Sequence, residues 1–262
     1  MEKNTFNSIQ SLDRGLHLLE ILVGDEGDLG VTELSRKIGV DKSTAYRLLS
    51  TMQSRGYVRQ NQETKKYGAG LKVVELSTAI LNKMRLRQIA QPFLKTLVRE
   101  TDETAHLAIL VQEKVVYIDR EKSQGVISIN TEVGAEAPPH CTAIGKVILA
   151  YVSEEELSSI VKKKDLHRYT PKTITSLTAL KLHLRKVRES GYAFDDEEFN
   201  PGVRCLAVPI RNHRGEVIAS IGISGPASRI VPDRVPQLVE IIKNIADQVS
   251  MTLGHRSNMR DV

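Results

Sequence analysis

Residues 31–60 read VTELSRKIGVDKSTAYRLLSTMQSRGYVRQ, and they contain two short helical patterns separated by Gly39. A glycine at this point favours the left-handed backbone conformation that ends a helix. Thr32 stands where it can cap the first helix. Asp41 stands where its carboxylate can accept hydrogen bonds from the free amides in the first turn of the second helix. The stretch therefore predicts a helix–turn–helix.

The second helix of this motif has one apolar face and one polar face. Its apolar residues recur at the spacing of a single helical face: Ala45, Leu48, Leu49 and Met52. The opposite face carries short polar side chains around one arginine: Ser43, Arg47, Ser50 and Ser54. Small hydroxyl side chains let a helix approach bases and phosphates closely, and arginine is the side chain that most often contacts guanine. We therefore interpret residues 41–54 as a DNA-recognition helix.

The flanking segments complete a winged helix–turn–helix. We expect the recognition helix to contact DNA through six residues: Lys42, Ser43, Thr44, Tyr46, Arg47 and Ser50. Residues 57–60 and 66–67 predict two strands around a polar turn, whose basic side chains are available for phosphates: Arg59, Lys65 and Lys66. Residues 11–24 predict the first helix, with these apolar side chains toward the core: Leu12, Leu16, Leu19 and Leu22 or Val23.

The charge changes sign within this predicted domain. Met1 to Ser35 contain two basic and seven acidic residues, whereas Arg36 to Lys66 contain eight basic and two acidic residues. Such asymmetry gives the domain a basic face, which the phosphates of DNA attract. The alternative is a three-helix corner whose basic face is only solvated. The wing and the charge asymmetry together favour binding to nucleic acid.

The composition of the chain favours a cytoplasmic protein. Its 262 residues are enough for one large or two ordinary domains, and the net charge of +5 permits a nucleic-acid partner. There is no apolar run near the ~18 residues of a membrane span, so we expect no membrane association. The first 15 residues lack the features of a secretory signal. The two cysteines, Cys141 and Cys205, fit a reduced protein rather than a disulfide scaffold.

The chain divides into three predicted parts: residues 1–70, the winged domain; residues 71–84, a linker helix; and residues 85–262, a second domain. In the second domain strands are expected within these ranges: 103–121, 126–134, 203–210 and 216–225. Helices are expected over 86–101, 141–152, 154–163, 176–191 and 231–254. A mainly antiparallel sheet with helices on its faces predicts an α+β fold.

The second domain carries scattered polar residues but no catalytic or metal-binding motif. The candidates are His106, His140-Cys141-Thr142, residues 195–198 (DDEE), Arg204-Cys205 and Ser224. Taken singly, the cysteines can be small core residues and the acidic run an exposed loop. Taken together, a helix beginning near Thr142 points free amides at a small anion, and Asp195 and Cys205 complete the pocket. A hydrolase or a zinc site has no supporting spacing, so we expect no catalytic residue, metal or cofactor.

The whole chain resembles the IclR-type transcriptional regulators. In the first domain the resemblance rests on SLDRGLHLLEIL (11–22), GVTELSRKIGVDKSTAYRLLSTMQSRGYV (30–58) and KYGAGLKVVEL (66–76). In the second it rests on PPHCTAIGKVILA (138–150), TITSLTAL (173–180), VRESGYAFDDEEFNPGVRCLAVPI (187–210) and GEVIASIGISGPASRI (215–230). The segments GYAFDDEE, GVRCLAVPI and ISGP are highly specific as a set.

The resemblance implies a GAF-like second domain that binds a small metabolite, often a carboxylate. It places the effector on the backbone amides of Ala143 and Ile144, with contacts from three side chains: Asp195, Cys205 and Ser224. A further pocket serine found in some members is replaced here by Gly222. This departure removes one hydrogen-bond donor and weakens the transfer of a specific ligand such as glyoxylate.

The resemblance also implies a homodimer or homotetramer that binds a near-palindromic double-stranded operator, with repression as the expected sign. The segments CTAIGKVILA, KTITSLTAL and RCLAVPI look closer to the regulators of 2-keto-3-deoxygluconate catabolism, which favours a 2-keto acid as effector. Three alternatives stay open. They are an activator that senses an aromatic or sugar acid, an enzyme that uses the Cys/Asp pocket, and an architectural DNA-binding protein without a ligand.

Overall fold

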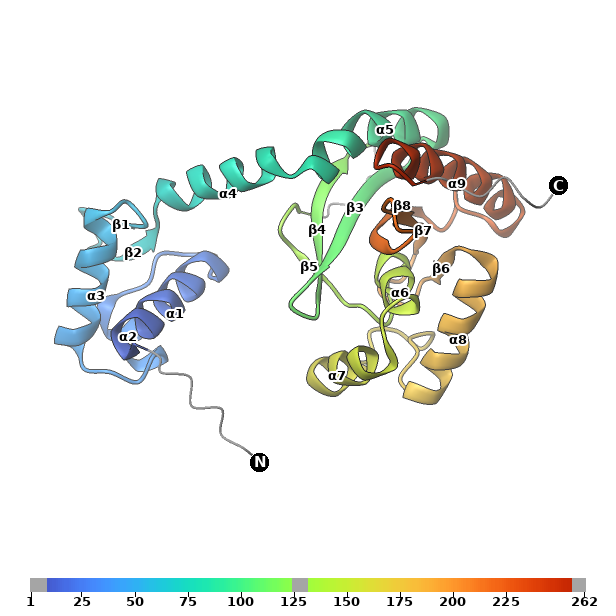
Figure 1. Cartoon of the computed structure of the whole chain (residues 1–262). Coiled ribbons are helices and arrows are strands. Elements are labelled where there is room, and N and C mark those ends of the chain that lie inside the picture. Colours follow the sequence, from blue (N-terminus) through green and yellow to red (C-terminus); the bar gives the residue numbers. More distant parts are fainter. Residues whose placement is uncertain (1–8, 124–131, 256–262) are drawn as a thin grey trace. The chain divides into compact units, whose positions relative to one another are not determined.

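A computed structural model describes residues 9–123 and 132–255 of the chain (Figure 1). The chain forms two compact units, Met1–Lys83 and Met84–Val262. Each unit has its own hydrophobic core. In the described part of the chain, no helix has both the length and the apolar character needed to cross a membrane.

The first unit is a winged helix–turn–helix. Its elements are α1 (Gln10–Gly24), α2 (Val31–Lys37), α3 (Lys42–Ser54), β1 (Val58–Gln60), β2 (Tyr67–Ala69) and α4 (Leu71–Lys83). β1 and β2 pair antiparallel as a short hairpin. The core gathers one or two buried side chains from each of the first five elements: Leu18, Leu22, Leu34, Leu49, Val58 and Tyr67.

The helix ends of this unit confirm two local predictions and correct a third. The Asp41 carboxylate accepts a hydrogen bond from the Thr44 amide at 2.9 Å, so it caps α3 as predicted. Gly39 has a φ of 66°, the left-handed conformation expected after α2. The prediction that Thr32 caps α2 is wrong. Gly30 occupies the cap position without a side-chain hydrogen bond, and Thr32 lies inside the first turn.

The predicted core face of α1 is wrong in part, since Leu22 is buried and Leu19 packs against the core as expected. Leu12, Leu16 and Val23 are 59%, 54% and 55% exposed, whereas Leu18 and Leu22 are buried. The helix carries leucines on two adjoining stripes, and the core packs on the stripe that contains Leu18 and Leu22. The second strand of the wing also differs slightly, because it begins at Tyr67 and continues to Ala69.

The second unit is built around one antiparallel sheet of six strands in the order β5-β4-β3-β8-β7-β6. The strands are β3 (Thr104–Val111), β4 (Lys114–Glu121), β5 (Glu136–Ala137), β6 (Ala193–Asp196), β7 (Val203–Arg211) and β8 (Val217–Pro226). The helices are α5 (Arg85–Thr101), α6 (Ala143–Ala150), α7 (Glu154–Lys164), α8 (Leu177–Ser190), the 3₁₀ turn η1 (Pro232–Arg234) and α9 (Val235–Thr252). This arrangement confirms the predicted α+β class.

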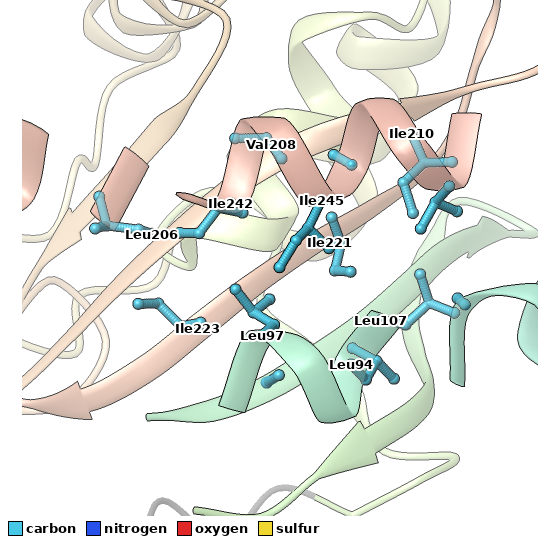
Figure 2. Packing of buried hydrophobic residues seen from close by; sticks show 14 of the residues in the cluster. Leu94, Leu97, Leu107, Leu206, Val208, Ile210, Ile221, Ile223, Ile242 and Ile245 are labelled. Carbon is cyan, nitrogen blue, oxygen red and sulfur yellow. The ribbon is translucent and has the colours of Figure 1, made fainter. Parts of the chain in front are cut away.

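One face of the sheet packs against α5 and α9 (Figure 2). Leu94 and Leu97 of α5 and Ile242 and Ile245 of α9 meet branched aliphatic side chains from three strands. The strand residues in this layer are Leu107, Leu206, Val208, Ile210, Ile221 and Ile223. Because side chains alternate along a strand, the residues between them face the other way.

The opposite face of the sheet carries small residues and is covered by α6 and α8. Ala108, Ala193 and Ala207 lie on this face and pack in the same cluster as these helices. All eight residues of α6 are buried. Small side chains on the sheet allow α6 to approach it closely, and this fixes the amino terminus of α6 over the ends of β6, β7 and β8, where the candidate site lies.

Two further predicted segments of this unit are the strand at 126–134 and the acidic run at 195–198. The strand predicted over 126–134 falls mainly on residues that the structure does not describe. Of the two interpretations of the acidic run at 195–198, the exposed loop does not hold for Asp195, because Asp195 and Asp196 end strand β6 and Asp195 is buried. Pairing with β7 therefore carries Asp195 into the interior of the unit.

Candidate functional site

The structure places the predicted DNA contacts of α3 at the surface of the first unit. Five of the six are exposed: Lys42, Ser43, Tyr46, Arg47 and Ser50. The sixth, Thr44, is half-buried. The apolar face behind them is turned inward, because Ala45 and Leu49 are buried and Leu48 and Met52 pack against the same core.

Asp41 organises the hydroxyl groups at the start of α3. Ser43 Oγ donates to its carboxylate at 2.5 Å and Thr44 Oγ1 at 2.7 Å, in addition to the Thr44 amide. These hydrogen bonds, with that of Ser43 contributing most, hold the pKa of Asp41 below its usual range. Because both hydroxyl protons point at Asp41, the oxygens of Ser43 and Thr44 are left to accept hydrogen bonds from a partner.

The basic residues of the wing differ in what they contact. Arg59 makes two hydrogen bonds to the Asp28 carboxylate, at 2.9 and 2.8 Å, so its guanidinium already has an anionic partner. Lys65 and Lys66 lie exposed in the turn between the two strands. Of the three predicted phosphate contacts, these two lysines are therefore the better placed.

A second candidate site is a cavity of about 40 Å³ in the second unit, at one end of the sheet face that α6 covers. All five predicted effector contacts line it: Ala143, Ile144, Asp195, Cys205 and Ser224. The cavity is also lined by residues that were not predicted to bind an effector, among them His106, Tyr117, Phe199 and Asn200. The site is assembled from five strands (β3, β4, β6, β7 and β8), a helix terminus and the loop after β6.

The strand register explains why three of these side chains meet. Asp195 on β6 is the Cα partner of Cys205 on β7, and Cys205 is the partner of Ser224 on β8. Partners on neighbouring antiparallel strands project from the same face of a sheet. The three side chains therefore form one row, in which Ser224 Oγ donates to Cys205 Sγ at 3.1 Å.

The amino terminus of α6 supplies backbone donors to the cavity. Thr142 caps the helix by accepting a hydrogen bond from the Gly145 amide at 3.2 Å. The first amides of a helix have no partner within it, so the cap leaves those of Ala143 and Ile144 for another acceptor. The helix dipole adds partial positive charge at this point, which favours an anion.

Asp195 is the titratable side chain in the row. Burial raises the pKa of Asp195 to about 7, although the Lys146 ammonium acts in the opposite direction. The Glu198 amide donates to the Asp195 carboxyl group at 2.7 Å. Lys146 is itself fully buried, where it pairs with the Glu198 carboxylate and donates to the Phe194 carbonyl at 2.5 Å. Asp195 can therefore be neutral near pH 7 and donate a hydrogen bond to an anion.

The remaining candidates do not form a catalytic group. Burial raises the pKa of the Cys205 thiol well above its usual value and that of the Cys141 thiol to about 12, so both are protonated at neutral pH and are poor nucleophiles. His140 and Cys141 are not among the residues that line the cavity. Arg204 pairs with Asp196 at 2.6 Å. Within residues 9–123 and 132–255, no group of three or more potential ligands is arranged to hold a metal ion.

Both units match models of a single family. Residues 11–62 match the IclR helix-turn-helix domain, and residues 78–251 match the Bacterial transcriptional regulator IclR C-terminal domain. The chain belongs to the IclR family. Proteins of this family are transcriptional regulators that bind DNA, not enzymes.

The similarity to other IclR-family proteins extends over nearly the whole chain. The Transcriptional repressor IclR of Escherichia coli (strain K12) is 37% identical over 248 residues, which are 94% of this chain and 90% of the relative. The regulator KdgR of the same organism is 37% identical over 249 residues, 95% of this chain and 94% of the relative. Because the identities to IclR and to KdgR are equal, they do not show that the chain is more similar to one of these two regulators than to the other.

A solved IclR homolog from Microbacterium hydrocarbonoxydans shares the fold with a TM-score of 0.80 at 26% identity, and the match covers 93% of this chain and 98% of that one. That homolog was crystallised in complex with 4-hydroxybenzoate. The fold of this IclR-family chain is thus one in which another member has been solved with a small acid.

Proposed function

We propose that this IclR-family regulator is a cytoplasmic repressor whose operator affinity changes when a small carboxylate binds in the cavity of the second unit. The observation that carries the proposal is the convergence of donors on one cavity. The amides of Ala143 and Ile144 meet the row of Asp195, Cys205 and Ser224 there. Two backbone amides at a helix terminus match the two oxygens of a carboxylate. The 4-hydroxybenzoate bound by the related homolog belongs to the same chemical class.

The size of the cavity favours a short acid. About 40 Å³ corresponds to roughly three water-sized volumes. Acids of two or three carbon atoms, such as glyoxylate and pyruvate, suit this volume. A longer keto acid or an aromatic acid requires the loop with Phe199 and Asn200 to move outward. Because the Microbacterium homolog was solved with 4-hydroxybenzoate, an aromatic acid is the second candidate for the effector.

We propose that α3 enters the major groove of the operator. Its contacts are Lys42, Ser43, Thr44, Tyr46, Arg47 and Ser50, while Lys65 and Lys66 hold phosphates. To contact a phosphate, the Arg59 guanidinium has to be shared between the phosphate and Asp28, or has to leave Asp28.

We propose that the protein acts as a homodimer, or as a tetramer made of two dimers. Among its described side chains, α4 has none that is buried, although it carries several apolar residues: Leu71, Val74, Leu76 and Ile80. On α1, Leu12 and Leu16 are exposed as well. Apolar helix faces of this kind are ordinarily covered, and a two-fold partner would also fit the symmetry of a near-palindromic operator.

Melting of the full-length protein with acids tests the effector. The panel is glyoxylate, pyruvate, 2-keto-3-deoxygluconate and 4-hydroxybenzoate, because a ligand that binds only the folded state raises the melting temperature as its concentration rises. We expect a shift from at least one acid, and its loss in Ser224→Ala and Asp195→Ala. If no acid shifts the transition, the cavity is not a carboxylate site.

The acid that shifts the melting temperature is then added to the protein on operator DNA selected from genomic fragments. We expect it to change the operator affinity, which it can do only by binding the two DNA-binding states with different affinity. An acid that binds without changing the operator affinity would contradict regulation by this ligand.

A further inference from the structure

His106 on β3 is a buried polar side chain that has no hydrogen-bond partner in the described part of the chain. It is 1% exposed, and both ring nitrogens are unpaired. The side chain lines the same cavity as Asp195 and Ser224. Because a buried polar group without a partner is costly to leave unpaired, an imidazole in this position points to a partner that enters the cavity.

The sheet register places His106 beside the polar row. Its Cα partner on β8 is Gly222, which in turn pairs with Ala207 on β7. Ala193 on β6 completes this row. The adjacent row contains Ser224, Cys205 and Asp195, each two residues from its counterpart on the same strand and ~7 Å away. Toward β8, β7 and β6 the row of His106 consists of glycine and alanine, and on the other side of His106 its Cα partner on β4 is Arg120.

The small residues of this row leave the imidazole open toward the ligand space. Tyr117 packs on the ring with a centroid separation of 5.4 Å and an angle of 59° between the ring planes. Gly222 contributes no side chain, and an added Cβ there would come within 2.3 Å of the Leu206 carbonyl oxygen. The ring is thus held by Tyr117, while no side chain from position 222 can satisfy its nitrogens.

The environment also fixes the charge of His106. Burial lowers the pKa of His106 to about 4, and the Arg120 guanidinium acts in the same direction. A neutral imidazole has one N–H donor and one acceptor nitrogen. Its N–H can donate to a carbonyl oxygen, and its second nitrogen can accept from a hydroxyl group, without adding a charge to the cavity.

We propose that His106 is a specificity-determining residue that hydrogen bonds the oxygen on carbon 2 of the bound acid. The carboxylate would bind to the first amides of α6 and to the row of Asp195, Cys205 and Ser224. The 2-oxo or 2-hydroxyl oxygen would then point toward His106. The site would then select 2-oxygenated acids over unsubstituted acids of equal length. This inference rests on the proposed carboxylate-binding function.

The test compares pairs of acids that differ only in this oxygen, on the full-length protein. Calorimetric titration with pyruvate and propionate, and with glyoxylate and acetate, measures the preference directly. For the wild type we expect the oxygenated acid to bind about tenfold tighter or more. His106→Phe keeps a planar ring against Tyr117 and should weaken pyruvate to the level of propionate while leaving propionate unchanged. His106→Gln keeps a donor and should retain part of the preference.

Two further measurements distinguish failure of the His106 inference from failure of the proposed function. Ser224→Ala should weaken both acids of a pair alike, because it acts on the carboxylate. If acids bind but His106→Phe leaves the preference unchanged, His106 only packs or bonds to water, and the inference is wrong while the proposed function stands. If no acid binds the wild type, the proposed function and the inference both fail. In ¹⁵N spectra, pyruvate should shift the His106 ring nitrogens, assigned with His106→Gln; absence of that shift in a pyruvate-bound sample contradicts the contact.

Discussion

In the proposed function, Asp195 couples binding of the acid to its own protonation. Its carboxyl group lies in a cavity whose other charged neighbours, Lys146 and Glu198, already pair with each other. The proposed carboxylate ligand would add a negative charge to this group. It would therefore bind best to the form of the protein in which Asp195 is neutral and donates a hydrogen bond.

The first prediction follows from the pKa of Asp195, which is about 7. Affinity for an acid should be constant below this pH and should fall as pH rises above it, by up to tenfold per unit. Asp195→Asn keeps a donor without a charge and should bind the acid with a flat pH profile. Calorimetric titration between pH 5.5 and 8.5 checks this. Equal slopes in the two proteins would show that Asp195 does not face the ligand charge.

The second prediction concerns the stability of the free protein. A carboxyl group whose pKa is raised in the folded state binds more protons there than in the unfolded chain, so stability falls as pH rises from about 4 to about 7 and levels off above. In Asp195→Asn this contribution is absent. The free energy of unfolding measured in urea should therefore decline less steeply across that window in the variant. Parallel declines would contradict the assignment of the raised pKa to Asp195.

The third prediction concerns Arg47, which is exposed on the outer side of α3. If its guanidinium makes a bidentate contact with a guanine, Arg47→Ala should cost ~1–3 kcal/mol on the operator and relax the base preference at one position. Binding to a set of operators with single-base changes measures this. Equal weakening on every sequence would show that Arg47 contacts phosphate only.

At the level of helices and strands, the predictable parts of the fold were those with one consistent signal. The α3 helix has a single apolar stripe and an acidic cap, and both are confirmed. In α1, by contrast, leucines occupy two adjoining stripes. Which stripe becomes buried depends on how α1 packs against α3 and the wing, and the periodicity of a single helix holds no information on that packing. Pro, Gly and cap residues marked several helix ends, yet Thr32, a residue type common at caps, lies two residues after the cap position that Gly30 occupies.

The effector cavity was predictable only in part. Asp195, Cys205 and Ser224 were expected there by resemblance, and the register of β6, β7 and β8 shows why they are adjacent. Tyr117 was missed because the β3–β4 pairing shifts after Leu107, and a bulge of this kind changes which residues share a face. The loop residues Phe199 and Asn200 carry no periodic signal at all.

The fourth prediction distinguishes the two stripes of α1. Leu18 is fully buried, so Leu18→Ala should lower the free energy of unfolding by ~2–5 kcal/mol. Leu12 is 59% exposed in the single chain, so Leu12→Ala should change the stability of the unassociated protein by less than ~0.5 kcal/mol. Urea unfolding of both variants, at a protein concentration at which sedimentation shows a monomer, checks this. Similar losses in the two monomeric variants would mean that Leu12 packs within its own chain.

The fifth prediction concerns the wing. Lys66 is exposed in the turn, so Lys66→Ala should reduce the slope of log affinity against log salt by about one. Arg59→Ala is the matched control, because Arg59 is already paired with Asp28 and should release fewer counterions. Binding titrations over a range of potassium chloride concentrations measure both slopes. An unchanged slope for Lys66→Ala would remove the wing turn from the DNA interface.

At the level of the whole chain, two units with separate cores share one polypeptide, and regulation requires that their binding reactions be coupled. Coupling of this kind is reciprocal: whatever factor the acid imposes on operator affinity, the operator imposes on acid affinity. Both sites lie wholly within their own unit, since no residue of the first unit lines the cavity. In the proposed function, the ligand would therefore act by changing the population of DNA-binding states rather than by contacting DNA.

The two faces of the sheet in the second unit serve different purposes on alternate residues. Leu206 and Val208 belong to the aliphatic layer against α5 and α9, whereas Cys205 and Ala207 face α6; Cys205 lines the cavity, and Leu206 reaches it as well. In the proposed function, a substitution on the α6 face mainly alters ligand binding, and a substitution in the aliphatic layer mainly alters the stability of the unit. Gene duplicates can therefore drift toward new metabolites by changing every second residue of a few strands while the scaffold is preserved. The same separation gives an engineer a short list of positions for retargeting a biosensor.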